Sequence, residues 1–185
     1  QSMFNGNAGN ANLKRGFRAY KLFKQLALDN LQTDSGLETV LDFGCGWGRI
    51  TRFFQREIDP SNLWGSDCTD SAETAFKSTE TSRWAQFMRN DLLPPIAFDD
   101  RTFDLIYLNS VFSHLTEEAH QQWLTEFYRI LKPGGMLVAT TWGKEFIDRC
   151  VEVRNKPASE RTVPESIWVD AFVDTNKALQ DFHQG

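Results

Sequence analysis

Three glycines at alternating positions follow a short apolar segment of this 185-residue chain. Residues 40–43 have the composition of a buried β-strand, and Gly44, Gly46 and Gly48 come directly after them. Glycines at such a place allow a tight turn and let a ligand approach the backbone at the start of the next helix. Asp42 adds a negative charge just before the turn, which suits a ligand with an ammonium group better than a pyrophosphate. The segment therefore predicts a ligand-binding loop.

Two common glycine-loop patterns are not met here. A nicotinamide dinucleotide loop needs a glycine at the sixth position counted from Gly44, and this position is Arg49. A phosphate-binding loop would have lysine followed by serine or threonine, and the segment has neither. The spacing therefore disfavours an oxidoreductase of the dinucleotide-binding type.

The loop requires a scaffold, and the remaining periodicity predicts one. Short apolar, β-prone segments alternate with segments whose apolar residues recur at helical spacing. We expect strands at 39–43, 63–67, 86–89, 103–108 and 136–141, and helices at 13–27, 50–58, 71–81 and 117–131, the last capped by Thr116. This alternation predicts an α/β fold with a doubly wound, mainly parallel sheet, whose strands all point their carboxyl ends at the edge where such folds bind ligands.

Composition restricts the class of protein further. The net charge is −5, so no overall positive field attracts nucleic acid or anionic lipid. No apolar stretch approaches the roughly 20 residues that a membrane span needs. Three cysteines without a CxxC pair are typical of a reduced protein, so we expect a cytoplasmic location, and we expect no metal site.

Five segments, in this order along the chain, resemble the motifs of class I methyltransferases that use S-adenosylmethionine. They are V-L-D-F-G-C-G-W-G-R-I (40–50), G-S-D-C (65–68), N-D-L-L (90–93), F-D-L-I-Y-L-N-S-V-F-S-H-L (103–115) and R-I-L-K-P-G-G-M-L-V (129–138). The resemblance covers about residues 37–143 and implies a three-layer, Rossmann-like fold. It also implies S-adenosyl-L-methionine as cofactor and S-adenosyl-L-homocysteine as product.

The resemblance implies a role for each matching residue. The glycine loop would wrap the methionyl part of the cofactor, Asp67 would accept hydrogen bonds from both ribose hydroxyls, and Asp91 would accept from the adenine amino group. Taken singly, each acid is equally typical of a cap or a turn. The cofactor-binding residues implied are Asp42, Gly44, Cys45, Gly46, Gly48, Asp67, Cys68, Asp91, Leu92, Asn109 and Ser110.

Methyl transfer from a sulfonium is an in-line displacement, so the protein mainly has to orient the acceptor and exclude water. A general base is needed only where the acceptor keeps its proton at neutral pH. His114, which follows the fourth strand, is the candidate base, and a structural hydrogen-bond donor is the alternative. In the basic first helix, Arg15, Arg18 and Tyr20 are expected to cover the pocket or to meet the cofactor carboxylate. A solvated surface is the alternative for the basic residues.

We therefore expect a methyltransferase that acts on a small-molecule acceptor, without nucleic-acid or membrane partners. The alternative is a cofactor-binding module that regulates or scaffolds without catalysis. The expected organisation is a tag remnant and flexible arm over residues 1–12, a helical region over 13–36 and the methyltransferase domain over 37–185.

The final segment departs from the family pattern. The family normally adds a helix and an antiparallel strand pair after the fifth strand, whereas residues 144–185 suggest a short helix, one strand at 167–173 and a helix at 176–182. The strand pair is thus expected to be incomplete: the sequence stops early, a flexible part is absent, or another chain completes the edge. The last alternative predicts a homodimer.

Overall fold

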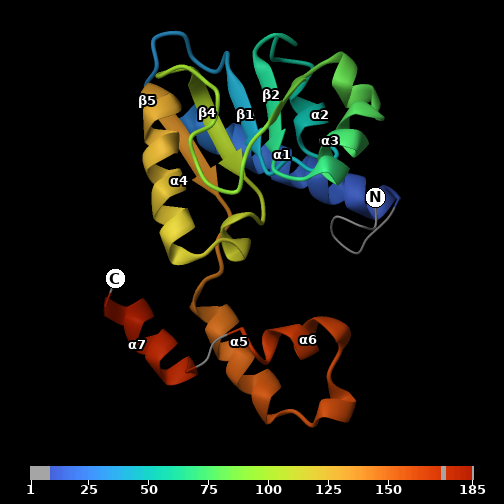
Figure 1. Ribbon diagram of the computed structural model, residues 1–185, viewed down its shortest axis with the longest axis vertical. Helices are drawn as coiled ribbons and strands as arrows, with labels where there is room; N and C mark the ends of the chain where they lie inside the picture. Colours follow the sequence, from blue (N-terminus) through green and yellow to red (C-terminus); the bar gives the residue numbers. More distant parts are fainter. Residues whose placement is uncertain (1–8, 172–173, 185) are drawn as a thin grey trace. The chain divides into compact units, whose positions relative to one another are not determined.

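The computed structural model describes residues 9–171 and 174–184 of the chain. It divides into two compact units, with the boundary between Thr140 and Thr141. This boundary falls inside the expected domain 37–185. The first unit carries the sheet and the second is helical, and each is described by itself below (Figure 1).

The first unit is built on a parallel five-stranded sheet, which confirms the predicted α/β, doubly wound fold class. The strand order is β3-β2-β1-β4-β5, so the order reverses next to β1 and places the carboxyl ends of β1 and β4 side by side. Ligands of open α/β sheets bind at such a reversal. The strands are β1 (Val40–Phe43), β2 (Leu63–Asp67), β3 (Gln86–Arg89), β4 (Phe103–Leu108) and β5 (Leu131–Ala139).

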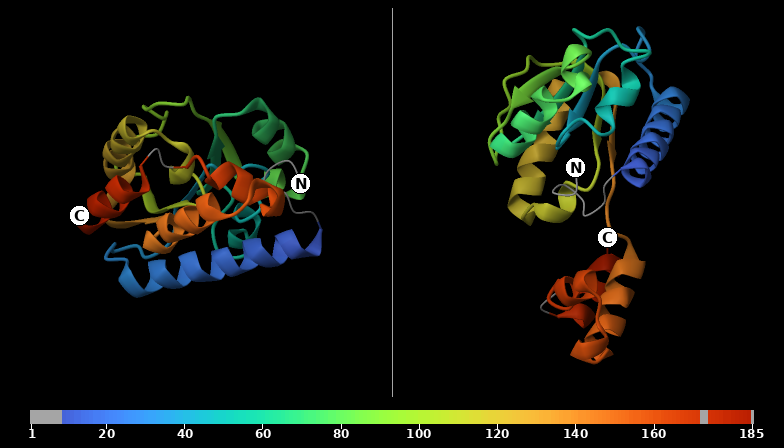
Figure 2. Two further views of the ribbon diagram at one scale, coloured as in Figure 1. Left: turned by 90° about the horizontal axis from the view of Figure 1, so that it is seen from below. Right: turned by 90° about the vertical axis from the view of Figure 1, so that its right-hand side faces the viewer.

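Helices cover both faces of this sheet, and Figure 2 shows α1 and α4 on opposite sides of it. Along β4, Leu105 and Tyr107 pack into the cluster that holds Phe23 of α1, whereas Ile106 and Leu108 pack against Trp123 of α4. The alternation follows from the two-residue period of a strand. The helices of the unit are α1 (Asn10–Asn30), α2 (Thr51–Phe54), α3 (Asp70–Lys77) and α4 (Glu117–Ile130), with 3₁₀ turns η2 (Glu80–Arg83) and η3 (Phe112–His114).

Several predicted boundaries were wrong. The expected arm over residues 1–12 ends earlier, because α1 already begins at Asn10; residues 1–8 lie outside the described part. The helix expected over 50–58 is only the single turn α2 followed by further turns, and α3 ends at Lys77. The strand β5 begins at Leu131 rather than at Met136, with a shift in its pairing to β4 between these residues.

The second unit contains α5 (Lys144–Asn155), η4 (Ala158–Glu160), α6 (Val163–Trp168) and α7 (Thr175–Gln184). The strand predicted at 167–173 was wrong, because residues 163–168 are helical and a turn follows; residues 172–173 lie outside the described part. The reason is a local helix start: the backbone N–H of Thr162 donates to Glu165 Oε2 at 2.8 Å. The predicted helix over 176–182 is confirmed as α7.

Glu165 also joins parts of the second unit. Its carboxylate is buried and pairs with Arg149 at 2.8 Å and Lys156 at 3.0 Å. Hydrogen bonds from the backbone N–H of Thr162 and, to a smaller extent, from Lys156 lower the pKa of Glu165 to about 2. Over the described residues of this unit, 141–171 and 174–184, the chain forms no strand, so the sheet has no antiparallel pair there. In the part of the chain that the structure describes, no helix has the length and apolar character needed to cross a membrane.

Candidate functional site

Two adjoining cavities lie at the carboxyl ends of β1, β2 and β4, and Gly44, Asp67 and Ser110 line both of them. The first, here called the loop cavity, has a volume of about 520 Å³ and is lined by Arg15, Gly44, Cys45, Gly46, Trp47, Arg49, Asp67, Asn109 and Ser110. The second, the apolar cavity, has a volume of about 280 Å³ and is lined by Phe43, Gly44, Asp67, Cys68, Asn90, Asp91, Leu92, Ser110, Val111, His114, Leu115 and Trp123.

The glycine loop is held against its neighbours by its backbone. The N–H groups of Gly44 and Cys45 both donate to the carbonyl of Ser66, at 2.8 and 2.9 Å. Gly44 has a φ of +74°, and a Cβ there would lie 2.3 Å from Cγ2 of Val111. Only glycine therefore lets the loop pass this close to the segment after β4.

The carboxylate of Asp67 stands where the two cavities meet. Its Oδ2 accepts from the N–H of Gly46 at 3.1 Å, and its Oδ1 accepts from the N–H and hydroxyl of Thr69 at 3.1 and 3.0 Å. These donors orient the carboxylate from the loop side and from the start of α3. The side chain is half-buried, and each oxygen has more than one lone pair, so the group can accept further hydrogen bonds from a ligand.

Ser110 adopts a backbone conformation that is uncommon for a residue with a side chain. Its φ is +65°, and its N–H donates to Oγ1 of Thr140 at 2.7 Å. A non-glycine residue in this region costs about 1–3 kcal/mol, and such residues gather at ligand sites. The strain lies at the point where the chain leaves β4 and turns between the two cavities.

Asp42 lies beneath the loop and lines neither cavity. It is 2% exposed, and Oδ2 accepts from the hydroxyl and the N–H of Thr51 at 2.6 and 3.2 Å. Burial raises the pKa of Asp42 to about 6, although the hydrogen bonds from Thr51 oppose this rise. The residue ties the end of β1 to the start of α2 and thereby fixes the loop between them.

The raised pKa of Asp42 predicts a pH dependence of stability. A carboxyl whose pKa is higher in the folded state contributes stability below its unfolded pKa and loses it as the pH rises through about 6. The free energy of unfolding of Asp42→Asn should therefore gain about 3 kcal/mol relative to the parent protein between pH 3.5 and pH 7.5. Urea unfolding of both proteins at a series of pH values measures this difference. A difference that does not change with pH would contradict the assignment.

Two arginines line one end of the loop cavity. Arg15 was predicted to cover the pocket or to meet the cofactor carboxylate, but Arg49, which lines the same cavity, was considered only as a departure from a glycine pattern. Arg49 is half-buried; burial lowers its pKa, and the charge of Asp42 opposes this shift. Its place directly after the third loop glycine was the available signal. Two guanidinium groups in one cavity suit a carboxylate.

The apolar cavity combines a hydrophobic wall with polar groups at one end. The indole N–H of Trp123 donates to the carbonyl of Leu92 at 3.0 Å, which holds the segment after β3 against α4. Asn90 is 6% exposed, and its Oδ1 has no hydrogen-bond partner within the described residues. Trp123 was not predicted as a site residue, because nothing in the spacing shows that α4 reaches this cavity. Asn90 was not predicted either, although its place directly before Asp91 was an available signal.

Most of the predicted site residues are brought together in these cavities, and four are not. Gly48 packs on the core, since a Cβ there would lie within 3 Å of Phe76 and Thr81. Arg18 lines neither cavity, and Tyr20 is buried on another side of α1, where its hydroxyl donates to Glu57 at 2.6 Å. The fourth is Asp42. The expectation that Arg18 and Tyr20 cover the site is therefore not supported by their positions. Among the side chains that the structure describes, no three potential metal ligands form a group.

The parallel sheet with this strand order and the paired cavities at its switch point define a Rossmann-like fold of the class I methyltransferase type. A family model described as a methyltransferase domain matches residues 40–135, and the chain belongs to this family.

Among curated proteins, the chain is 28% identical over 164 residues to tRNA N(3)-methylcytidine methyltransferase trm140 of Schizosaccharomyces pombe, covering 83% of this chain and 52% of that protein. It is 30% identical over 118 residues to malonyl-[acyl-carrier protein] O-methyltransferase of Calditerrivibrio nitroreducens, covering 64% and 44%. It is 26% identical over 184 residues to the ubiquinone/menaquinone biosynthesis C-methyltransferase UbiE of Citrobacter koseri, covering 88% and 72%. The chain thus spans about half the length of the first two.

Solved structures show the same fold. The YcgJ protein from Bacillus subtilis superposes with a TM-score of 0.56 at 19% identity, over 75% of this chain and 59% of that chain. The plantazolicin methyltransferase BpumL, solved in complex with SAH, gives a TM-score of 0.60 at 16% identity, over 88% and 58%.

Proposed function

We propose that the chain binds S-adenosylmethionine across the two cavities and transfers its methyl group to a small-molecule acceptor. The observation that carries this proposal is the position of Asp67 at the junction of the cavities, with its carboxylate held by Gly46 and Thr69. One carboxylate at this place can accept from both hydroxyls of a ribose, and such charge-assisted hydrogen bonds are strong.

The chemistry of the two cavities fits the two halves of the cofactor. The apolar cavity offers Phe43, Leu115 and Trp123 to a nucleoside base, with Asn90 and Asp91 as acceptors for its amino group. The loop cavity offers Arg15 and Arg49 to the carboxylate of an aminoacyl chain. The residues present therefore suit a thio-nucleoside that carries an amino acid.

When bound, S-adenosylmethionine supplies an electrophilic methyl group on a sulfonium that needs no further activation. The residues of the chain then bind and orient: Gly44 and Ser110, shared by both cavities, border the space between the nucleoside and aminoacyl ends. Orientation of the reacting atoms can lower a barrier by about 7–11 kcal/mol. His114 lines the apolar cavity and is exposed, so it can exchange a proton with solvent and take one from an acceptor.

The proposed acceptor is a small molecule. One relative is named for ubiquinone/menaquinone biosynthesis and another for malonyl-[acyl-carrier protein]. The net charge of −5 provides no general attraction for a polyanion. The relative from Schizosaccharomyces pombe is named for a tRNA substrate, so tRNA belongs in any acceptor panel.

Calorimetric titration tests the cofactor, and mass spectrometry tests the reaction. We expect S-adenosylmethionine and S-adenosylhomocysteine to bind and NADH not to bind. Incubation with a panel of quinols, malonyl thioesters and unmodified tRNA should then give a product heavier by one methylene from a small molecule. Binding without any turnover would favour the non-catalytic alternative, and preferential binding of NADH would overturn the proposal.

Replacement of His114 by alanine should lower turnover while leaving cofactor affinity nearly unchanged, because the imidazole would act on the acceptor proton. His120→Ala is the matched control, since His120 lies in α4, contacts Phe112 and lines neither cavity. Single-turnover rates should fall in His114→Ala and remain at the parent value in His120→Ala. Equal rates for His114→Ala and the parent protein would remove this residue from the mechanism.

A further inference from the structure

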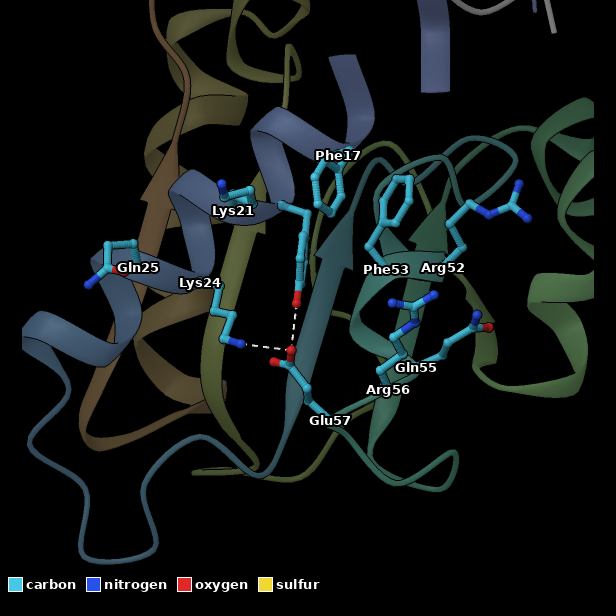
Figure 3. Close-up of a pocket in the computed structure, with 10 residues that line it drawn as sticks. Phe17, Lys21, Lys24, Gln25, Arg52, Phe53, Gln55, Arg56 and Glu57 are labelled. Atoms are coloured by element: carbon cyan, nitrogen blue, oxygen red, sulfur yellow. Dashed lines mark hydrogen bonds and ion pairs between the residues drawn. The ribbon is translucent and has the colours of Figure 1, made fainter. Parts of the chain in front are cut away.

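A third cavity of about 550 Å³ lies between α1 and the α2 segment, and Figure 3 shows the side chains that line it. None of these residues lines the loop cavity or the apolar cavity. We call it the α1–α2 groove; its lining comprises Phe17, Tyr20, Lys21, Lys24 and Gln25 from α1, and Arg52, Phe53, Gln55, Arg56 and Glu57 from α2 and the turns after it.

The groove carries positive charge that its own carboxylate does not balance. Lys24 pairs with Glu57 at 2.7 Å, and the hydroxyl of Tyr20 donates to the same Oε1 atom (Figure 3). Burial opposes ionisation of Glu57, but the hydrogen bonds from Lys24 and Tyr20 outweigh it and lower the pKa of Glu57. Lys24 and Glu57 therefore neutralise each other.

Three cations remain: Lys21, Arg52 and Arg56. Within the described residues, none of them has a carboxylate at ion-pair distance, whereas ten other basic residues do. Lys21 and Arg52 lie instead over the rings of Phe17 and Trp47, each about 5.9 Å from the ring centroid. In a chain of net charge −5, the groove thus has one unpaired cation on the α1 side and two on the α2 side (Figure 3), which favours an anionic ligand.

The groove also presents an aromatic surface beside these cations. The ring of Phe17 is 46% exposed and lies 5.3 Å from the ring of Phe53, centroid to centroid, at 62°. Figure 3 shows these two rings at one end of the groove, with the arginines on the α2 side. A partly exposed phenylalanine next to guanidinium groups can stack on a planar ring that carries a phosphate.

We propose that the α1–α2 groove binds a nucleotide whose base stacks on Phe17, with phosphate groups held by Arg52 and Arg56 on the α2 side and by Lys21 on the α1 side. The nucleotide can be free or a unit of a single-stranded RNA, since both offer the same phosphate and base. The proposal uses no residue of the two cofactor cavities, so it stands or fails separately from the methyltransferase function.

Fluorescence anisotropy with a labelled single-stranded RNA of roughly 12 nucleotides, and calorimetry with ADP, test the two sources. Three phosphate contacts predict that the logarithm of the RNA association constant falls with the logarithm of salt concentration with a slope of about −2. The double variant Arg52→Ala/Arg56→Ala should reduce this slope to about −0.7. The matched control is Lys77→Ala/Arg83→Ala, which removes two exposed cations paired with Glu73 and Glu80 outside the groove.

Two single variants complete the test. Phe17→Ala distinguishes a nucleotide site from a merely charged surface, and Lys21→Ala provides a second measurement of the charge contribution. Phe17→Ala should weaken binding about fivefold or more through the lost stacking. Lys21→Ala, an exposed change on α1, should reduce the salt slope if the double variant does not fold. Binding of ADP alone identifies a free nucleotide as the ligand, and binding of the RNA, with or without ADP, identifies a unit of single-stranded RNA; either result supports a nucleotide site. The proposal is overturned if neither ligand binds, if the control loses as much as the groove variants, or if Phe17→Ala binds normally.

Discussion

Asp67→Ala should weaken binding of S-adenosylmethionine tenfold or more, which corresponds to about 1.4 kcal/mol or above. The variant removes the acceptor of both ribose hydroxyls and also releases the N–H of Gly46, which now donates to Oδ2 at 3.1 Å. Calorimetry with S-adenosylhomocysteine gives the dissociation constant directly, without competition from turnover.

Asp59→Ala is the matched control for this change. Asp59 accepts from the N–H and hydroxyl of Ser61 at 2.9 and 2.6 Å, as Asp67 accepts from Thr69, but it is exposed and lines neither cofactor cavity. Both variants should therefore lose the hydrogen bonds that the aspartate accepts from the residue two positions later. Only Asp67→Ala should lose affinity for S-adenosylhomocysteine. The same affinity in Asp67→Ala and the parent protein would refute the role given to this carboxylate.

Gly44→Ala should have the largest effect on stability, a loss of about 2–5 kcal/mol in the free energy of unfolding. Its φ of +74° imposes a cost of about 1–2 kcal/mol on a residue with a side chain. The added Cβ would also lie 2.3 Å from Cγ2 of Val111, and overpacking of this kind costs about 1–3 kcal/mol. Chemical denaturation measures the sum.

Gly36→Ala and a double variant separate the conformational cost of the positive φ from the cost of overpacking against Val111. Gly36 has the same φ of +74°, but nothing lies within 4 Å of the position of its Cβ, so only the conformational cost should appear there. Val111→Ala removes the γ-methyl groups that the new Cβ would contact. The double variant Gly44→Ala/Val111→Ala should therefore regain the part of the free energy of unfolding that Gly44→Ala loses through overpacking. Equal losses for Gly44→Ala and Gly36→Ala would show that the close approach to Val111 is not limiting.

The sequence was sufficient to predict the sheet. Strands such as β4 are apolar throughout and bounded by turn residues, and their alternation with helices specifies a parallel sheet with little ambiguity. The carboxyl-end residues Gly44, Asp67 and Ser110 could then be placed at one edge, because parallel strands end together. The confirmed strand positions follow from this reasoning.

Other features depend on contacts that no spacing shows. Asp42 was predicted to contact the ligand, but its carboxylate is buried and accepts hydrogen bonds from the hydroxyl and the N–H of Thr51. The segment 163–169 has β-branched and aromatic residues, yet the bond between Thr162 and Glu165 starts a helix there. Trp123 reaches the apolar cavity only through the packing of α4 on the sheet, which no spacing shows.

A crystal structure with S-adenosylhomocysteine tests most directly whether a thio-nucleoside binds between the glycine loop and Asp67. The predicted result places the ribose hydroxyls within hydrogen-bond distance of the Asp67 carboxylate, the base in the apolar cavity and the aminoacyl carboxylate beside Arg15 and Arg49. A ligand that binds outside the two cavities would contradict this binding mode. A ligand that occupies both cavities with its ribose remote from the Asp67 carboxylate would contradict it as well.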